Sequence, residues 1–366
     1  MKIFITYFLL TIWSSLYIAW HYAAAAEDYP HAAGAAVFII MLVSFNAIWL
    51  MIASVRRKIR LTRHQNNILS LLLGFSFFLM LLFIANDMLF FFEEYAFWYF
   101  SRARTAVFTI TAVAAGATFF AFANSYFVRV TCYNITPDKP ALDFSVAMVS
   151  DLHIDESGMS ARRMEKIIYR INELKPDFAV FAGDIIESTP EHFIREDFPR
   201  IIKKLQTRFP PVAVIGNHEY YGGRIRENIE ALQQAGLTVL RDEILNIPEL
   251  GVSLLGRDDK MNRGRCALCD LKGKAPADFL TILLDHNPQY IDEAVDNGID
   301  IQLSGHTHNG QIFPFNLIVR RIFANGYGYR KIGGTHTVVS SGAGTWGPSL
   351  RLGTKAEIAF IRVKSV

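Results

Sequence analysis

Four long apolar segments fill the first third of the chain, and they set the strongest limit on how it can fold. They cover residues 3–26, 33–54, 69–89 and 106–127. Each is long enough to cross about 30 Å of hydrocarbon, which takes about 20 helical residues. The alternative, buried helices of a soluble protein, fits four consecutive runs of this length poorly, and 51% of the 366 residues are hydrophobic. We therefore predict a four-helix transmembrane domain in residues 1–130.

Basic residues between the second and third apolar runs predict the orientation. Short loops rich in Lys and Arg stay on the cytoplasmic side of a membrane. This loop holds five of them: Arg56, Arg57, Lys58, Arg60 and Arg63. The chain is then a multi-pass protein of the cell (inner) membrane, with both termini and its second half in the cytoplasm. Arg102 and Arg104 in the third connection oppose this orientation, with two charges against five.

The first apolar run leaves a second interpretation open. Lys2, the apolar stretch and the small residues at 23–26 would also fit a signal peptide with a cleavage site. The stretch exceeds the roughly 7–15 apolar residues of such a peptide, which favours an uncleaved anchor.

After the last apolar run the chain changes from a connector to alternating strands and helices. Turn residues in N-I-T-P-D-K-P indicate a linker at 131–143, followed by a soluble domain at 144–366. A helix is predicted at 160–174, because Met164, Ile167, Ile168 and Ile171 recur at helical spacing. A second helix is expected at 227–235. Strands are expected at 144–149, 178–182, 212–215, 281–284 and 299–303.

Each of these strands is followed by short motifs of Asp, His and Asn. The motifs are D-L-H (Asp151, His153), G-D (Asp184), G-N-H-E (Asn217, His218), L-D-H-N-P (His286) and G-H-T-H (His306, His308). Ligand sites of open α/β sheets lie just past the carboxyl ends of strands. Oxygen and nitrogen donors without Cys are those that hold hydrolytic transition metals. Two dications about 3.5–4 Å apart can clamp both oxygens of a phosphoryl displacement, so the motifs predict a dinuclear metal site.

These motifs resemble the calcineurin-like metallophosphoesterase superfamily over about residues 144–366. The resemblance is closest to the membrane-anchored subgroup of bacterial proteins and animal transmembrane proteins. That subgroup shares a G-H-T-H-x-G-Q-I-x-P-F pattern, here with Asn309 after the last His, and a glycine-rich segment like 341–347. The resemblance implies an α+β fold, an α/β/β/α four-layer sandwich with two β-sheets.

The same resemblance implies a role for each motif residue. Asp151, His153 and His308 would bind one metal ion, Asn217, His286 and His306 would bind a second, and Asp184 would bridge them. His218 would protonate the leaving oxygen. Glu187 would support His218, at a position where relatives more often have Asp. The two divalent ions would be manganese, iron or zinc.

The substrate is less constrained. A net charge of only +3 and the lack of a basic stripe disfavour nucleic acid. A site beside a bilayer favours hydrolysis of a phosphodiester or pyrophosphate bond in a lipid-linked phosphoester. A soluble nucleotide diester, or a non-catalytic regulatory module of a membrane protein, remains the alternative. Cys266 and Cys269 form a single C-x-x-C, which we interpret as reduced surface-loop thiols.

Overall fold

The computed structural model describes residues 2–26, 30–55, 61–90, 104–139 and 142–364, and the chain forms two units. The first comprises Met1–Ala123 with Gly347–Leu350, and the second comprises Asn124–Trp346 with Arg351–Val366. Each unit is described by itself.

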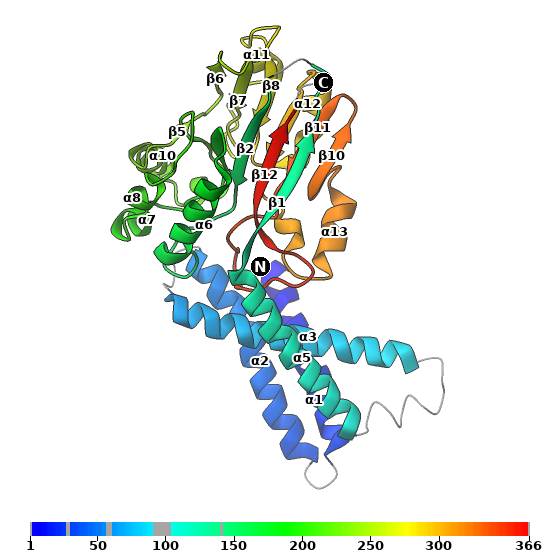
Figure 1. Ribbon diagram of the computed structural model, residues 1–366. Helices are drawn as coiled ribbons and strands as arrows, with labels where there is room; N and C mark the ends of the chain where they lie inside the picture. Colours follow the sequence, from blue (N-terminus) through cyan, green and yellow to red (C-terminus); the bar gives the residue numbers. More distant parts are fainter. Residues whose placement is uncertain (1, 27–29, 56–60, 91–103, 140–141, 365–366) are drawn as a thin grey trace. The chain divides into compact units, whose positions relative to one another are not determined.

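All four apolar runs of the first unit are helical: α1 (Lys2–Ala25), α2 (Pro30–Val55), α3 (Arg63–Phe90) and α5 (Arg104–Tyr126) (Figure 1). Within the described part of the chain, two helical stretches are long and apolar enough to cross a membrane, Arg63–Leu89 and Arg104–Tyr126. A shorter apolar stretch is Pro30–Asn46. The four-span arrangement therefore stays a prediction, and four residues of its basic loop, with Arg102, lie outside the described residues: Arg56, Arg57, Lys58 and Arg60.

The second unit contains two six-stranded sheets. The first has the order β1-β12-β2-β3-β4-β5 and the second the order β10-β11-β9-β8-β7-β6. The strands of the first sheet are β1 (Val128–Ile135), β12 (Ala356–Val363), β2 (Phe144–Val149), β3 (Phe178–Ala182), β4 (Val212–Val214) and β5 (Thr238–Val239). Those of the second are β10 (Gly328–Ile332), β11 (Thr335–Val339), β9 (Ile301–Ser304), β8 (Leu280–Leu284), β7 (Val252–Gly256) and β6 (Glu243–Ile247). The strands predicted from the sequence are all present.

β1 takes up part of the segment that we predicted as a linker at 131–143. It pairs in parallel with β12 along its whole length, from Val128 opposite Ala356 to Ile135 opposite Val363. Its V-R-V-T-C-Y-N-I sequence is rich in β-branched residues, which suit a pleated strand. The turn residues after Ile135 mark the end of strand β1 and not the end of the last helix. The sheet therefore begins earlier in the chain than the predicted linker allowed.

Both faces of strand β2 are apolar, and each face packs into a different core of the second unit. Val146 and Met148 belong to the apolar core between the two sheets, whereas Ala147 and Val149 belong to the core on the outer face. Successive side chains of a strand point to opposite faces. Full burial of a large aliphatic side chain contributes about 1.5–3 kcal/mol, so both cores stabilise this sheet.

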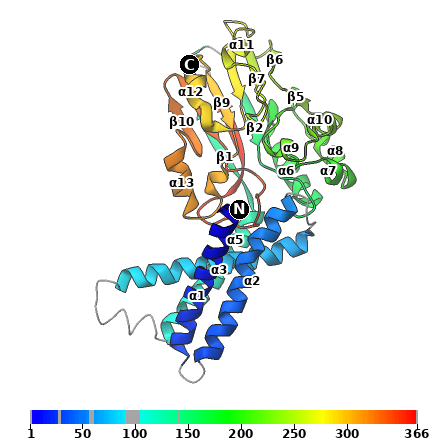
Figure 2. The ribbon, with the colours of Figure 1, turned by 180° about the vertical axis from the view of Figure 1, so that it is seen from behind.

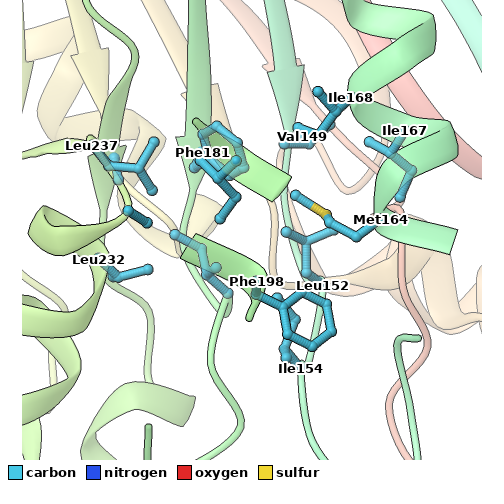
Figure 3. Packing of buried hydrophobic residues seen from close by; sticks show 14 of the residues in the cluster. Val149, Leu152, Ile154, Met164, Ile167, Ile168, Phe181, Phe198, Leu232 and Leu237 are labelled. Carbon is cyan, nitrogen blue, oxygen red and sulfur yellow. The ribbon is translucent and has the colours of Figure 1, made fainter. Parts of the chain in front are cut away.

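The outer face of the first sheet is covered by helices α6 (Ala161–Leu174), α7 (Glu191–Arg195), α8 (Phe198–Ile202) and α10 (Ile225–Gln234). Figure 3 shows Met164, Ile167 and Ile168 of α6 against Val149 and Phe181 of the strands. The predicted helical face is therefore confirmed. On the second sheet, α11 (Leu268–Lys272) and α12 (Ile291–Asp296) pack through Leu268, Leu271 and Ala294.

Candidate metal centre

The two sheets bring the carboxyl ends of five parallel-paired strands to one region. β2, β3 and β4 pair in parallel in the first sheet, and β8 pairs in parallel with β9 in the second. Each is followed within three residues by a motif residue: Asp151, Asp184, Asn217, His286 and His306. Parallel strands end at the same sheet edge, so motifs far apart in the sequence meet in space.

The first cluster consists of Asp151, His153 and His308, all buried. His308 Nε2 lies 3.4 Å from Asp151 Oδ1 and 3.0 Å from His153 Nε2. Asp151 is held in place by the backbone N–H of His306, which donates to its Oδ1 at 3.0 Å. Two imidazole nitrogens and a carboxylate oxygen thus face one point.

The second cluster consists of Asp184, His286 and His306. His286 Nδ1–H donates to the carbonyl oxygen of Ala182 at 2.8 Å. This bond directs Nε2 toward Asp184 Oδ2, 3.1 Å away. A backbone acceptor behind a histidine is the usual way to fix the ring of a metal ligand.

Asn217 supplies one of the orphaned buried polar atoms of this region. Its Nδ2 donates to the Tyr221 hydroxyl at 2.8 Å, which orients the amide. Its Oδ1 is buried and has no hydrogen-bond partner among the residues that the structure describes. A buried acceptor without a partner is costly, and a cation would satisfy it. The donor set of carboxylate, imidazole and amide oxygen fits a divalent transition metal.

Asp184 belongs to the second cluster and also lies close to the first. Its Oδ2 is 4.0 Å from His153 Nε2 and 3.1 Å from His286 Nε2. Its Oδ1 accepts the backbone N–H of His218 at 2.9 Å. One carboxylate is therefore close to a histidine of each cluster, which is the position that a bridging ligand needs.

Glu187 joins His153 and His218. Its Oε2 lies 2.8 Å from His153 Nδ1 and 2.8 Å from His218 Nδ1. Burial would lower the pKa of His218, but Asp184 and Glu187 outweigh it and raise the pKa to about 9. His218 therefore carries a proton at neutral pH in the absence of bound cations, and its Nε2 remains directed away from Glu187.

Without a bound cation, electrostatics favour the metal-binding protonation state at three groups of the clusters and oppose it at two. Burial lowers the pKa of His306 to about 3, so this imidazole is neutral. Burial also lowers the pKa of His308 well below its usual range. Burial alone would raise the pKa of Asp184, but His286 and His218 hold it well below its usual range. Neutral imidazoles and an ionised carboxylate are the forms that bind metals.

Asp151 and His286 are the two opposed groups. Burial raises the pKa of Asp151. Burial would lower the pKa of His286, but Asp184 outweighs it and raises that pKa well above its usual range.

The backbone at the site is strained. Five of the motif residues are non-glycine residues with left-handed φ angles: Asp151 at 53°, His153 at 46°, Asp184 at 51°, His306 at 71° and His308 at 48°. Such conformations are uncommon for residues other than glycine. They persist where surrounding contacts over-determine them, and they cluster at functional sites.

Glycines before the motif residues allow close approach between the strands. A Cβ on Gly305 would come within 2.5 Å of Asp151 Oδ2, and one on Gly183 within 2.5 Å of His286 Nδ1. A Cβ on Gly216 would collide with Asp184 Oδ1. Side-chain clearance therefore requires glycine at these three positions, and Gly183 also has a left-handed φ of 84°.

Sequence reasoning assigned no role to Arg351, which the structure places beside the first cluster. Arg351 is fully buried, and its Nη2 donates to the carbonyl oxygens of Ser341 and Gly344 at 2.6 and 2.8 Å. The same loop donates its Gly344 N–H to the carbonyl oxygen of Asp151 at 2.9 Å. Arg351 therefore shapes the loop behind Asp151. No sequence motif marks this arginine, although it follows the glycine-rich segment.

The sequence analysis gave Glu219 of the G-N-H-E motif no role, but its carboxylate fixes the turns that carry Asp184 and Asn217. Its carboxylate accepts the backbone N–H groups of Ile185 at 2.6 Å, Ile186 at 2.9 Å and Gly216 at 2.8 Å. Cys266 and Cys269 form no disulfide in this structure, and Cys269 lies in α11 and not in a loop, so the reduced state of the two thiols stays a prediction.

Comparison with known proteins gives the same assignment to this half of the chain. A sequence model of the calcineurin-like phosphoesterase family matches residues 144–310. An uncharacterized metallophosphoesterase of Aquifex aeolicus is 31% identical over 251 residues, which cover 66% of this chain and 94% of that protein. One of Campylobacter jejuni is 32% identical over 229 residues, which cover 61% of this chain and 59% of that protein. The chain thus matches only about three fifths of the length of the Campylobacter relative.

The chain is also similar to a protein whose name describes it as transmembrane. The Bos taurus transmembrane protein with metallophosphoesterase domain is 30% identical over 251 residues, which cover 63% of this chain and 55% of that protein.

Proposed function

Because the chain belongs to the calcineurin-like metallophosphoesterase family, we propose that it is a membrane-anchored phosphoesterase with two divalent metal ions. It hydrolyses a phosphodiester or pyrophosphate bond. The observation that carries the proposal is the convergence of two buried donor clusters on Asp184.

In this proposal, each cluster holds one ion and Asp184 bridges the two. The first ion is held by Asp151, His153 and His308. The second is held by Asn217, His286 and His306, where the unpartnered Asn217 Oδ1 becomes a ligand. When bound, such ions supply an activated water and neutralise charge on the attacking and leaving oxygens. Manganese, iron and zinc all suit these ligands.

His218 is the proposed proton donor to the leaving oxygen. Its Nδ1 is engaged by Glu187, so the proton on Nε2 is the one free to move. Nε2 lies 3.9 Å from Asp184 Oδ2, close to where a phosphoester held at the clusters would sit. Tyr221 and Trp346, both half-exposed, place their rings beside the His218 ring and border this position.

A lipid-linked phosphoester is the proposed substrate. Two stretches of the same chain, Arg63–Leu89 and Arg104–Tyr126, are long and apolar enough to span a membrane. An anchored hydrolase meets lipid headgroups at high local concentration, whereas a soluble nucleotide gains nothing from the anchor. The basic loop at 56–63 favours a cytoplasmic catalytic unit, so the substrate would be a lipid intermediate exposed on that side.

Turnover of candidate substrates tests this function. The purified full-length protein and its Asp184→Ala variant would each be given an aryl phosphodiester and then a lipid extract. We expect the wild-type protein alone to cleave the diester and to deplete one class of phospholipid or lipid pyrophosphate, as seen by mass spectrometry. Cleavage of nucleotide diesters without any lipid change would reassign the substrate. No metal and no turnover would support the non-catalytic alternative.

A further inference from the structure

Helix α13 (Phe315–Ile322) carries its apolar face outward. Four of its five apolar residues, Phe315, Ile318, Val319 and Ile322, follow the spacing of one helical face, which normally packs on a core. The fifth, Leu317, lies off this face and is also exposed. Phe315, Ile318 and Ile322 are instead 45%, 51% and 68% exposed. The residue that faces inward is polar, because Asn316 is only 7% exposed.

Helix α6 shows what the same spacing does elsewhere in this unit. Its apolar residues also recur at intervals of three, one and three: Met164, Ile167, Ile168 and Ile171. All four are at most 2% exposed, since they pack on the first sheet (Figure 3). The same spacing is therefore fully buried in α6 and exposed in α13, so the spacing alone does not account for the exposure of α13.

The apolar face of α13 is extended by neighbouring side chains and flanked by positive charge. Phe313 and Trp346 are 46% and 47% exposed. Trp346 is tied to Gln311, just before α13, by a 3.0 Å bond from its backbone N–H to Gln311 Oε1. Arg320 and Arg321 are exposed and form no ion pair among the described residues.

The same end of the second unit holds the last turn of α5. Asn124 of that turn donates to the carbonyl oxygen of Thr354 at 3.0 Å, and Thr354 Oγ1 donates to the carbonyl oxygen of Gln311 at 2.6 Å. Both views of the unit place α13 at the end where β1 begins (Figures 1 and 2). α5 is a candidate membrane span that ends at Tyr126. If it crosses a bilayer, this end of the second unit is the end next to the membrane.

We propose that α13, with Phe313 and Trp346, is a surface that inserts into the interfacial layer of an anionic phospholipid bilayer. An amphipathic helix with an exposed apolar face and basic residues on its other side binds such an interface. Tryptophan is enriched at the headgroup level, and Arg320 and Arg321 complement anionic headgroups. This surface does not depend on the phosphoesterase activity.

The surface is continuous with the metal centre. The turn η2 (His308–Gly310) leads directly to α13, and Gly310 packs so closely on it that an added Cβ would lie 2.5 Å from Asn316 N. On the other side, the Trp346 ring centre lies 6.0 Å from that of His218. Insertion of α13 would therefore set the mouth of the site at the depth of lipid headgroups, where a lipid phosphoester can enter without leaving the membrane.

Spin-label accessibility in nanodiscs tests the surface with the full-length chain. Cys132, Cys266 and Cys269 would be replaced by Ser, and a nitroxide attached through Ile318→Cys or, separately, Ile322→Cys. Ile194→Cys on α7 is the matched control, because Ile194 and Ile318 are 52% and 51% exposed. Helices α7 and α13 lie on opposite sides of the unit (Figures 1 and 2). Relaxation by oxygen, which concentrates in lipid, would be compared with relaxation by a water-soluble nickel chelate.

We expect the oxygen-to-nickel ratio at positions 318 and 322 to exceed that at 194 several-fold in nanodiscs containing phosphatidylglycerol. The ratio should fall in pure phosphatidylcholine and after Arg320→Gln with Arg321→Gln. High nickel accessibility at both positions would overturn the proposal, because the face would then be in water. Low accessibility to both reagents would also overturn it, since a second copy or another segment of protein would then cover the face.

Discussion

Glu187 serves two imidazoles at once, and this makes it more than a support for the proposed acid. One of its oxygens lies 2.8 Å from the Nδ1 atoms of both His153 and His218. His153 belongs to the first donor cluster. His218 belongs to neither of the two proposed clusters, but it forms a third group of possible ligands with His153 and Glu187. The proposed proton donor and one proposed metal ligand therefore share an orienting carboxylate, which would couple proton transfer to metal binding.

Replacing His218 separates proton transfer from ligation. His218→Ala should keep both metal ions and lower kcat by about 10²–10⁴, the usual contribution of a general acid. The loss should shrink for aryl esters with good leaving groups, which need no protonation. Metal content and kcat for two leaving groups provide the readout. A collapse in metal content would instead make His218 a ligand.

Replacing Glu187 should affect both processes. Glu187→Gln removes the charge that orients His153, so metal affinity should fall by about 10–100-fold. At saturating metal, kcat for poor leaving groups should still be reduced, because His218 loses the same partner. Metal titration followed by kinetics measures both effects. The exposed Glu249→Gln is the control, and equal behaviour of the two variants would contradict the shared role.

Among the elements, the loop at 341–344 fixes the position of Asp151 from behind. Gly342 has a φ of +80°, and a Cβ there would lie 2.8 Å from Asp151 Cβ. The neighbouring Ala343 N–H donates to the carbonyl oxygen of Ser150 at 2.9 Å, and Arg351 holds the loop from its other side. The loop and the β2 end thus form one packed unit.

Gly342→Ala should displace Asp151 and lower kcat by about 10², the typical effect of a 1 Å misplacement. Gly298→Ala is the control, since Gly298 also has a left-handed φ, +62°, but nothing within 4 Å of its Cβ. Both variants should lose roughly 1–2 kcal/mol of stability from the backbone conformation alone. Thermal unfolding and kcat would be measured for both. An equal loss of activity in the two would refute the positioning role of the loop.

Elements with a clear period or ligand motif could be predicted from the sequence. The spacing of apolar residues from Met164 to Ile171 predicted helix α6. The D-L-H, G-D, G-N-H-E and G-H-T-H motifs predicted residues that the structure brings together at the strand ends. Arg351 and the second partner of Glu187 could not be predicted, because both depend on tertiary contacts between distant segments. The exposure of the apolar face of α13 could not be predicted from the sequence either, because its apolar residues have the same spacing as those of the buried helix α6.

For the whole molecule, the orientation in the membrane is open to direct measurement. The basic loop at 56–63 predicts a cytoplasmic catalytic unit, so a reporter fused after Val366 should behave as cytoplasmic. Neutralising Arg56, Arg57, Lys58, Arg60 and Arg63 should weaken this preference, because Arg102 and Arg104 then become the stronger retention signal. External labelling of the wild-type catalytic unit in intact spheroplasts would overturn the four-span topology.

The central claim is that two buried clusters and a shared Asp184 hold two metal ions that support hydrolysis. The most direct test compares three purified full-length proteins: the wild type, Asp184→Ala and the exposed control Asp197→Ala. For each, the number of metal ions per chain would be measured by mass spectrometry, and the turnover of an aryl phosphodiester would be measured alongside. We predict two ions and turnover for the wild-type protein and the control, and fewer ions with no turnover for Asp184→Ala, because both sites lose their shared anionic ligand. Two retained ions and near-normal turnover in Asp184→Ala would contradict the account.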